Sequence, residues 1–513
     1  MSANAPVAPK SEYQMTMEKQ VVQGESIIVH CAYVYVFCCL ILLAELAYIA
    51  ISYTTMYKDG YFGTENAVNL TPTMYTTSTF TYFKHCNDSL ICLFVGLGFM
   101  FSYLRFHRWM SLAMVLFASM FAMQFYILYS SFWAKAFISN ITSFLFAWNN
   151  PTNGGLNFSD FGTYIYNFEY FLRSIKCAFA VCISLGVVIG KIDAFQTFIL
   201  AIIEPIFFAL NEAFIFYGVE VKDRGGSIYI HTFGAFFGVT VSLIFCPSYD
   251  SSENRNNKPG YGSSAMAFLG TFFLWVFFPT FNAYNPMQTF ITQEVSYAYN
   301  MQFLGITNTF WALTSSTILA FWSSMIFKDK RFNIEHILRA TLAGGVMIGA
   351  CAEMFVFPYP ALLVGAAAGI ISVLSFTFLD PVLEKCGIYD TVGCFHLFGI
   401  PGIFGCIASA IAVINVFSTW YGNMFNVLTT YFRINRAPYQ QGGYQILAEV
   451  ITIAVAIIGG IIVGLIFKLI KYWGIPEDTF GDHIFFHLSY RLPDEGELEH
   501  RLYYKKPDLP QPK

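Results

Sequence analysis

The stretch Asp223-Arg-Gly-Gly-Ser-Ile-Tyr-Ile-His231-Thr-Phe-Gly234 opens a strongly apolar segment of the chain. Asp223 and His231 are eight residues apart, about two turns at 3.6 residues per turn, so the spacing predicts that they share one face of a helix. An ionisable residue inside a membrane helix is energetically expensive and is by default a candidate for function. The stretch therefore singles out Asp223 and His231.

A partial repeat of this stretch occurs later in the chain, as Asp390-Thr-Val-Gly-Cys-Phe-His396-Leu-Phe398-Gly399. Here the residue eight positions after the aspartate is Phe398 rather than a histidine. His396 precedes it by two positions, about 200° around a helix, so we expect His396 to face another direction. The aspartate of the pattern is thus present in both stretches, whereas the histidine is present only in the first.

The composition is that of an integral membrane protein. Of the 513 residues, 56% are hydrophobic and 12% are charged, whereas soluble domains carry about 25% charged residues. The net charge of −4 comes without a basic patch, which argues against a nucleic-acid partner. The twelve cysteines contain no C-x2-C pair, and His483 and His487 lack a third ligand, so we predict no metal site and no cofactor.

Runs of about 20 apolar residues, the length needed to span a bilayer, predict an all-α protein of about twelve transmembrane helices. The predicted spans are 27–51, 88–106, 110–134, 169–190, 194–218, 227–246, 263–281, 300–327, 336–354, 358–379, 391–416 and 446–470. The chain thus divides into an N-terminal tail of residues 1–26, a transmembrane domain of residues 27–470 and a C-terminal tail of residues 471–513.

Basic residues predict that both termini are cytoplasmic, because cytoplasmic loops carry an excess of lysine and arginine. In this orientation Asn69, Asn140 and Asn157, each in an N-x-S/T pattern, face the outside as possible glycosylation sites. External acceptor sites suit a multi-pass protein of the plasma membrane.

The stretch from Asp223 to Gly234 resembles the signature of the Rh glycoprotein branch of the ammonium transporter (Amt/Mep/Rh) family. Further matches follow in order along residues 88–470. They are Leu93–Phe99, Gly190-Lys191, Asn211-Glu212, Phe273-Leu-Trp275, Phe278–Asn282, Ala340–Gly345, Ala352–Met354, Gly369–Ser372, Asp390-Thr391 and Gly399–Gly402.

The resemblance implies a homotrimer with one narrow, apolar pore for ammonia or ammonium through each subunit. In the family, inverted five-helix repeats surround this pore, and this chain adds extra helices. Asp223 matches the aspartate that orders the site, His231 the first pore histidine, and Glu212 an acidic residue of the outer entry path. Phe281 matches the inner gate, with Asn282 beside it. Deprotonation before passage makes physical sense, because an ammonium ion in hydrocarbon costs on the order of tens of kcal/mol.

Two positions depart from the family pattern. Phe398 stands where the second pore histidine is expected, and Lys176 stands where the outer gate phenylalanine is expected. Phe398 removes one hydrogen-bonding partner of the solute, which corresponds to on the order of 1–3 kcal/mol. The lysine stem either reaches water from within its helix, or its amine occupies the site where ammonium is recruited and blocks it.

Three functions follow from these observations. The first is an Rh-type channel for ammonia or ammonium with altered proton handling. The second is a channel for carbon dioxide or another neutral gas. The third is a non-conducting structural or partner-binding subunit, for which we expect a closed pore and an ion pair between Lys176 and Asp223. An enzyme is not predicted, because the chain has no H-E-x-x-H, phosphate-binding loop or G-x-S-x-G motif in a suitable context.

Overall fold

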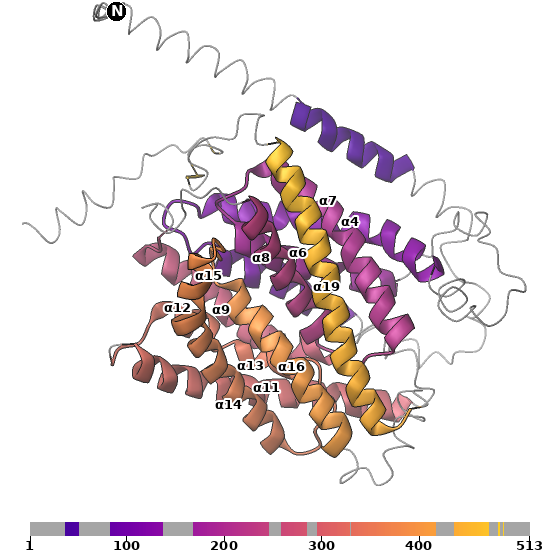
Figure 1. The fold of residues 1–513 in the computed structure, drawn as a ribbon, viewed down its shortest axis with the longest axis vertical. Helices are drawn as coiled ribbons and strands as arrows, with labels where there is room; N and C mark the ends of the chain where they lie inside the picture. Colours follow the sequence, from indigo (N-terminus) through magenta and orange to yellow (C-terminus); the bar gives the residue numbers. More distant parts are fainter. Residues whose placement is uncertain are drawn as a thin grey trace, which may run out of the picture.

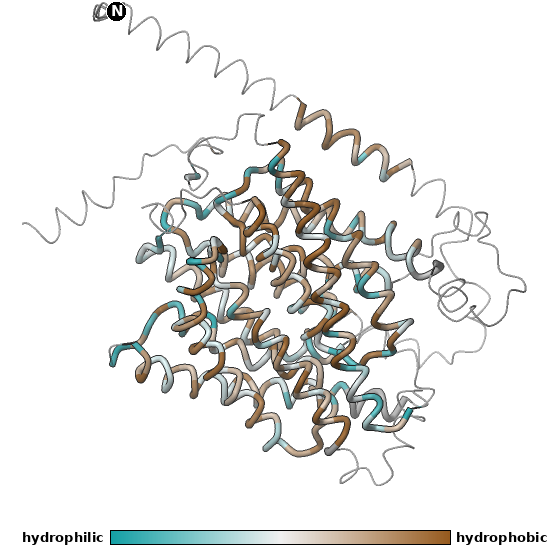
Figure 2. The backbone as a smooth tube through the Cα atoms, in the orientation of Figure 1, coloured by the Kyte–Doolittle hydropathy of each residue, from teal (hydrophilic) through white to brown (hydrophobic). Residues whose placement is uncertain are grey.

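The computed structural model describes residues 36–50, 83–136, 168–245, 258–284, 295–328, 330–416, 436–470, 481–482 and 486. In these ranges the protein is an assembly of packed helices (Figure 1). Nine of the described helical segments are long and apolar enough to cross a membrane. Figure 2 shows them as predominantly hydrophobic tubes with hydrophilic colour concentrated near their ends.

The nine spans consist of single helices or of an α-helix joined to a π-helical turn. They are α4 (Trp109–Ala136), α6 (Phe168–Val188), α7 (Ala194–Ala213) with η6 (Phe214–Val219), η7 (Ser227–Thr232) with α8 (Phe233–Phe245), α9 (Tyr261–Ala283), α11 (Val295–Phe327), α14 (Pro358–Leu374) with η8 (Ser375–Leu379) and α15 (Asp380–Lys385), η9 (Phe395–Gly399) with α16 (Ile400–Ile411) and η10 (Ala412–Val416), and α19 (Pro438–Ile470). Each corresponds to one of the twelve predicted spans.

The other three predicted spans are less regular. The first, 27–51, is described as an apolar helix only over Val36–Ala50. The second, 88–106, belongs to a helical segment of residues 83–101 that includes η2 (Ile91–Leu97) and α3 (Gly98–Phe101). The third, 336–354, is broken.

The segment 336–354 contains two short helices, α12 (Ile334–Arg339) and α13 (Ala343–Ile348), separated by turns. Side chains from elsewhere in the chain supply some of the missing partners. Ser227 Oγ donates to the Val346 carbonyl oxygen and accepts from the Ala350 N–H, both at 2.7 Å. A buried backbone must have its polar groups satisfied, and here Ser227 of η7 does this for two of them.

Two carboxylates cap long helices. Asp193 accepts from the Gln196 N–H at 2.8 Å while Gln196 Oε1 accepts from the Asp193 N–H at 3.1 Å, which is a capping box at the start of α7. At α4 the cap comes from the far end of the sequence. Asp482 accepts from the N–H groups of Arg108, Trp109 and Met110 at 2.7–3.0 Å.

Small residues allow α11 and α14 to approach closely. A Cβ atom at Gly365 of α14 would lie 2.1 Å from the Ala312 carbonyl oxygen of α11, and one at Gly344 of α13 would lie 2.3 Å from the same oxygen. Any larger residue would therefore force the backbones apart. This is the contact that small residues provide between membrane helices, as the clusters of glycine and alanine in the sequence suggest.

Candidate functional site

His231 lies at the centre of the helix assembly on η7. Its side chain is fully buried. Among the described residues neither ring nitrogen, Nδ1 or Nε2, has a hydrogen-bond partner. Leaving a buried polar atom unsatisfied costs about 1–3 kcal/mol, and such atoms are uncommon enough in native proteins to require an explanation. The imidazole is thus available to a polar molecule that reaches it.

Four buried phenylalanines surround the imidazole, and we call Phe179, Phe278, Phe281 and Phe398 the aromatic cage. Phe398 stacks on the imidazole with a centroid separation of 5.3 Å and an interplanar angle of 12°. The other three ring centroids lie 5.8–6.3 Å from that of the imidazole. The side chains in contact with the His231 ring are therefore largely apolar.

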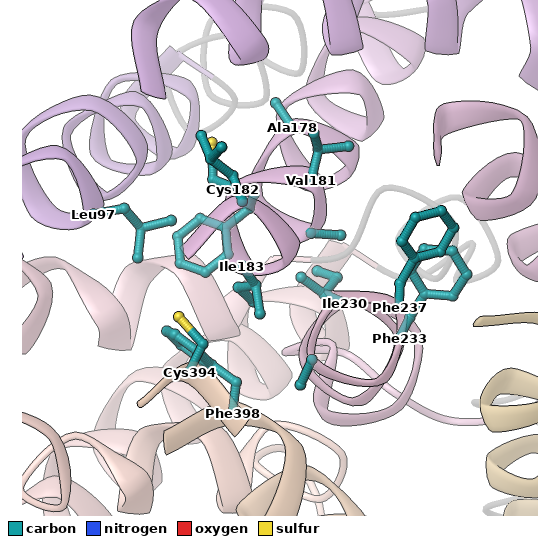
Figure 3. Packing of buried hydrophobic residues seen from close by; sticks show 14 of the residues in the cluster. Leu97, Ala178, Val181, Cys182, Ile183, Ile230, Phe233, Phe237, Cys394 and Phe398 are labelled. Atoms are coloured by element: carbon teal, nitrogen blue, oxygen red, sulfur yellow. The ribbon is translucent and has the colours of Figure 1, made fainter. Parts of the chain in front are cut away.

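Phe398 belongs to the packed interior. Figure 3 shows it in the same buried cluster as Ile183 of α6 and Ile230 of η7. Phe398 reaches His231 because η9 and η7 pack against each other. The structure thus places Phe398 directly beside the imidazole.

Lys176 of α6 lies over Phe281. Its Nζ atom donates to the Phe281 carbonyl oxygen at 2.7 Å and is 3.1 Å from the centroid of the Phe281 ring. The side chain is buried, so it does not extend into water. The amine donates to this carbonyl group rather than pairing with Asp223, the partner expected for a non-conducting subunit. A carbonyl oxygen together with an aromatic face is a typical environment for an ammonium group.

Phe179 was not singled out by the sequence. It follows Lys176 by one helical turn, and its ring centroid is 4.7 Å from that of Phe281. Phe179 and Phe281 thus form a pair of neighbouring rings beside His231. The only signal in the sequence is the i, i+3 spacing from Lys176, which places both on one side of α6.

Asp223 orders the start of η7. Its Oδ2 accepts from the N–H groups of Ile228 at 2.8 Å and Tyr229 at 2.9 Å. Burial raises the pKa of Asp223 to about 6, and these backbone N–H groups act in the opposite direction. The predicted shared helix face is wrong, because η7 begins at Ser227 and Asp223 lies four residues before it. The aspartate instead caps the helix that presents His231.

Glu212 of α7 is enclosed by other polar residues. Its carboxylate accepts from Arg173 Nε at 3.2 Å and Arg173 Nη2 at 2.8 Å, and it also accepts from the Tyr126 hydroxyl. A bidentate arginine pair of this kind is a strong charge-assisted contact. The carboxylate is buried and already neutralised, which favours a structural role over the recruitment of ammonium.

Asn282 joins three elements beside the cage. Its Nδ2 donates to Gly345 O at 2.7 Å and to Thr309 Oγ1 at 3.2 Å. It therefore connects α9 to α13 and α11 next to Phe281. Its Oδ1 is buried and has no partner among the described residues, so it is a second available acceptor in this region.

His396 faces away from His231. Its Nδ1 is 2.6 Å from Ser375 Oγ and its Nε2 is 3.1 Å from Asp380 Oδ1. Both ring nitrogens thus have partners on η8 and α15. The structure brings His231, Phe281, Asn282, Phe398 and Lys176 together and leaves His396 outside.

His85 is a further residue that sequence reasoning missed. It stacks on Tyr284 with a centroid separation of 4.8 Å, and its Nδ1 is 3.2 Å from the Thr280 carbonyl oxygen. It therefore lies at the end of α9, next to Phe281. The possible glycosylation sites Asn69, Asn140 and Asn157 lie outside the described residues.

The fold and the site define a polytopic α-helical membrane protein with a histidine in an apolar interior. The model of the Ammonium Transporter Family matches residues 173–487, more than half of the chain. The chain belongs to the ammonium transporter family, in its Rh branch.

Curated relatives support this assignment. The chain is 37% identical to the dog protein named ammonium transporter Rh type C over 337 residues, which cover 64% of this chain and 69% of that protein. It is 33% identical to ammonium transporter Rh type B of Takifugu rubripes over 426 residues, covering 81% and 85% of the two chains.

Solved structures share the fold. The chain is similar to the Rh50 structure of Nitrosomonas europaea, with a TM-score of 0.62 and 25% identity, over 83% of this chain and 96% of that chain. Mep2 of Saccharomyces cerevisiae gives a TM-score of 0.57 at 18% identity, over 78% and 88% of the two chains, which shows the common fold.

Proposed function

We propose that this protein is an Rh-type membrane channel that passes neutral ammonia beside His231. The observation on which this depends is the buried imidazole, whose two ring nitrogens have no hydrogen-bond partner in the part of the chain that the structure describes. Neutral imidazole has one donor and one acceptor nitrogen, and ammonia both donates and accepts. A passing ammonia molecule is therefore a suitable partner for the two atoms that the protein leaves unsatisfied.

The aromatic cage favours the neutral molecule over the ion. Phe398 and Phe278 offer no hydrogen-bond acceptor to replace the water around an ammonium ion. The attraction of a cation to an aromatic face, about 0.5–2 kcal/mol, recovers only a small part of the cost of desolvating the ion. The amine of Lys176 adds to this preference. When protonated, it repels a free ammonium ion at 4 Å by about 4 kcal/mol at an effective dielectric constant of about 20.

Proton handling differs from that expected with two facing histidines. Phe398 occupies the second position, so His231 has no imidazole partner to share a proton with. We therefore expect electroneutral movement of ammonia. On this proposal Asp223 orders the site, Phe281 with Phe179 forms the gate, and Glu212 supports the outer side without contacting the solute.

The proposal extends to the assembly and its surroundings. We propose a homotrimer in the plasma membrane, with both termini cytoplasmic and with Asn69, Asn140 and Asn157 as candidate glycosylation sites. Family membership and the basic residues near the ends of the predicted spans support it.

A proteoliposome assay tests conduction. The purified protein is reconstituted with a pH-sensitive dye inside the vesicles, and an ammonia gradient is imposed in a stopped-flow instrument. Faster internal alkalinisation than in empty vesicles supports conduction, and equal rates reject it. An electrical recording on the same vesicles should show no current dependent on ammonium.

Two histidine variants form a matched pair in this assay. His231→Ala should change the ammonia rate because it removes the unpartnered imidazole. His396→Ala removes an imidazole of the same size from the neighbouring η9, where Ser375 and Asp380 hold it, and should leave the rate close to that of the unchanged protein. Equal effects of the two variants would argue against His231 as the contact residue.

A second candidate function is a non-conducting subunit that keeps the transporter scaffold. The stacking of Phe398 on His231 and the position of Lys176 on Phe281 favour it, since both fill space beside the imidazole. This candidate predicts vesicles no faster than empty ones for ammonia. Conduction of carbon dioxide is measured with the same vesicles, loaded with carbonic anhydrase and exposed to a gradient of that gas.

A further inference from the structure

A pocket of about 600 Å³ opens at one end of the helix assembly, far in sequence from His231. It lies between the end of α11, the start of α12 and the segment before α9. The lining residues on which the argument depends are Tyr103, Lys328, Arg331, Phe332, Ile334 and Glu335. This is also the end at which Asp482 contacts the residues before α4, because Asp482 N donates to the Phe106 carbonyl oxygen.

Hydrogen bonds fix the shape of this pocket. The N–H of Arg105 donates to the Lys258 carbonyl oxygen at 3.0 Å, which joins the turn after Tyr103 to the segment before α9. The Asn333 N–H donates to Ser324 Oγ at 3.0 Å, which folds the chain back onto α11. These two hydrogen bonds fix the backbone on two sides of the pocket.

Among the described residues, the lining of the pocket carries more positive than negative charge. Lys328 and Arg331 are exposed and line the pocket. Glu335 is the one acidic lining residue among those that the structure describes, and its Oε1 already accepts from the Tyr103 hydroxyl at 3.0 Å. Glu335 Oε1 is also 3.9 Å from Arg339 Nη1.

A buried guanidinium lies directly behind these residues. Arg339 is 2% exposed, and its Cζ lies 4.4 Å from the centroid of the Tyr103 ring. Its Nε and Nη2 atoms have no hydrogen-bond partner among the described residues. A buried arginine with two unused donors next to a basic pocket indicates a missing acceptor, and phosphate oxygens suit the planar fork of arginine.

An apolar stripe leads along α11 toward the pocket. Ile318, Trp322, Met325 and Ile326 are exposed on α11 at the i, i+4, i+7, i+8 spacing of one helix face. Phe332 and Ile334 continue it as exposed apolar residues in the pocket wall. In Figure 2 the hydrophobic colour of α11 gives way to hydrophilic colour at the turn before α12.

We propose that this pocket binds the phosphate headgroup of an anionic glycerophospholipid whose acyl chains lie along α11. Lys328 and Arg331 contact the phosphate from the open side, and Arg339 adds positive charge from behind. Basic pockets between transmembrane helices bind anionic headgroups in this way. The apolar stripe distinguishes a lipid from free phosphate, because a phosphate ion has no apolar chain to pack against it.

Lipid retention measured by native mass spectrometry tests the proposal. The full-length protein is stripped of lipid in detergent and titrated with phosphatidylglycerol, with phosphatidylcholine as the neutral comparison. The double variant Lys328→Gln/Arg331→Gln should bind phosphatidylglycerol about 30-fold more weakly, since each basic residue near an anionic lipid contributes about 1 kcal/mol, or about fivefold. Binding of phosphatidylcholine should change little.

Matched controls separate the site from general charge. The double variant Lys385→Gln/Lys468→Gln removes two basic residues outside the pocket and should keep phosphatidylglycerol binding. An equal loss in both double variants overturns the proposal. Inorganic phosphate is added as a soluble competitor, and a phosphate-bound protein that ignores lipid overturns the assignment to a lipid.

Two further outcomes are informative. If a second copy of the chain covers the pocket instead, the Lys328→Gln/Arg331→Gln variant should change the oligomer mass and leave lipid binding intact, which overturns the proposal. The variant Lys328→Arg retains the charge and should retain binding, which supports the proposal if the double variant is correctly folded. The assay involves no transport, so its result is independent of whether the protein conducts ammonia.

Discussion

The segments that begin at Asp223 and Asp390 have the same backbone arrangement. They differ in the side chain that each places at the contact between η7 and η9. In each, an aspartate Oδ2 accepts from the N–H five residues later, that of Ile228 at 2.8 Å or Phe395 at 2.6 Å. In each, a π-helical turn follows and leads into an α-helix. The first presents His231 and the second presents Phe398.

The comparison shows that the backbone frame and the contacting side chain are separable. Asp390 still caps its helix although no histidine follows at the eighth position. The two rings nevertheless meet in a stacked arrangement. The aspartate caps the helix in both segments, and the identity of the ring decides which chemistry that helix offers.

The largest effect on stability is expected at the buried ion pair next to the first segment. Arg224 is paired with Glu353, and both side chains are buried. Glu353→Ala leaves a buried charge without its partner and should lower the free energy of unfolding by about 3–5 kcal/mol. Thermal unfolding of the purified protein in detergent measures this.

The matched control is Glu220→Ala. Glu220 pairs with Arg436 at 3.0 Å, but its side chain is 48% exposed, so the loss should be about 0–1 kcal/mol. If the two variants unfold at the same temperature, the first segment does not depend on its buried pair.

The largest effect on ammonia flux is expected from changing Phe398 of the second segment together with Lys176. Phe398→His combined with Lys176→Phe supplies a second imidazole and removes the amine from the Phe281 carbonyl oxygen. We expect ammonia flux to rise about ten- to hundredfold, because one hydrogen-bonding partner corresponds to about 1–3 kcal/mol. The proteoliposome assay measures it, with each single variant for comparison.

An inert double variant in that assay would mean that some other feature blocks the path. A rise with Lys176→Phe alone would show that the amine is the main obstacle. A rise with Phe398→His alone would assign the difference to the missing imidazole.

The two capping aspartates should differ in their contribution to stability. Asp223 accepts from the N–H groups of Ile228 and Tyr229, whereas Asp390 accepts from that of Phe395. We expect Asp223→Ala to cost about 2 kcal/mol and Asp390→Ala about 1 kcal/mol, within the range measured for helix caps. Denaturation midpoints of the two variants give the comparison, and the reverse order would contradict the roles assigned to the two caps.

The smallest effect is expected at Asp380. Its contact with His396 lies on the side away from His231, and its side chain is 38% exposed. Asp380→Asn keeps an oxygen acceptor and should change stability by less than about 1 kcal/mol and leave ammonia flux unchanged. A clear loss of flux would place His396 in the solute path.

The sequence predicted much of this fold because long apolar runs are a local property. Nine of the predicted spans correspond to described helical segments that qualify as spans. The run 336–354 was also predicted as a span from its apolar residues, but its backbone turns are held by contacts with distant residues. Ser227 supplies two of them and Gly225 N, which donates to Gly349 O at 2.8 Å, supplies a third. Hydropathy does not report such contacts.

The stretch from Asp223 to His231 singled out two residues that act on the same helix, but the predicted shared helix face was wrong. The helix begins only at Ser227, so Asp223 lies before it and caps it. Contacts between helices were not predictable at all. The enclosure of Glu212 by Arg173 joins residues 39 positions apart, and the contact of Lys176 with Phe281 joins residues 105 positions apart. Neither pairing has a local signature, so each required the assembled helices.

The cap on α4 has a practical consequence for handling the protein. The three N–H groups that Asp482 accepts from would lose their acceptor in a chain cut after Ile470, where α19 ends. Such a shortened protein should have a frayed α4 and yield less material on purification. Purification tags and fluorescent fusions are best attached beyond Phe486, so that the carboxylate keeps its place.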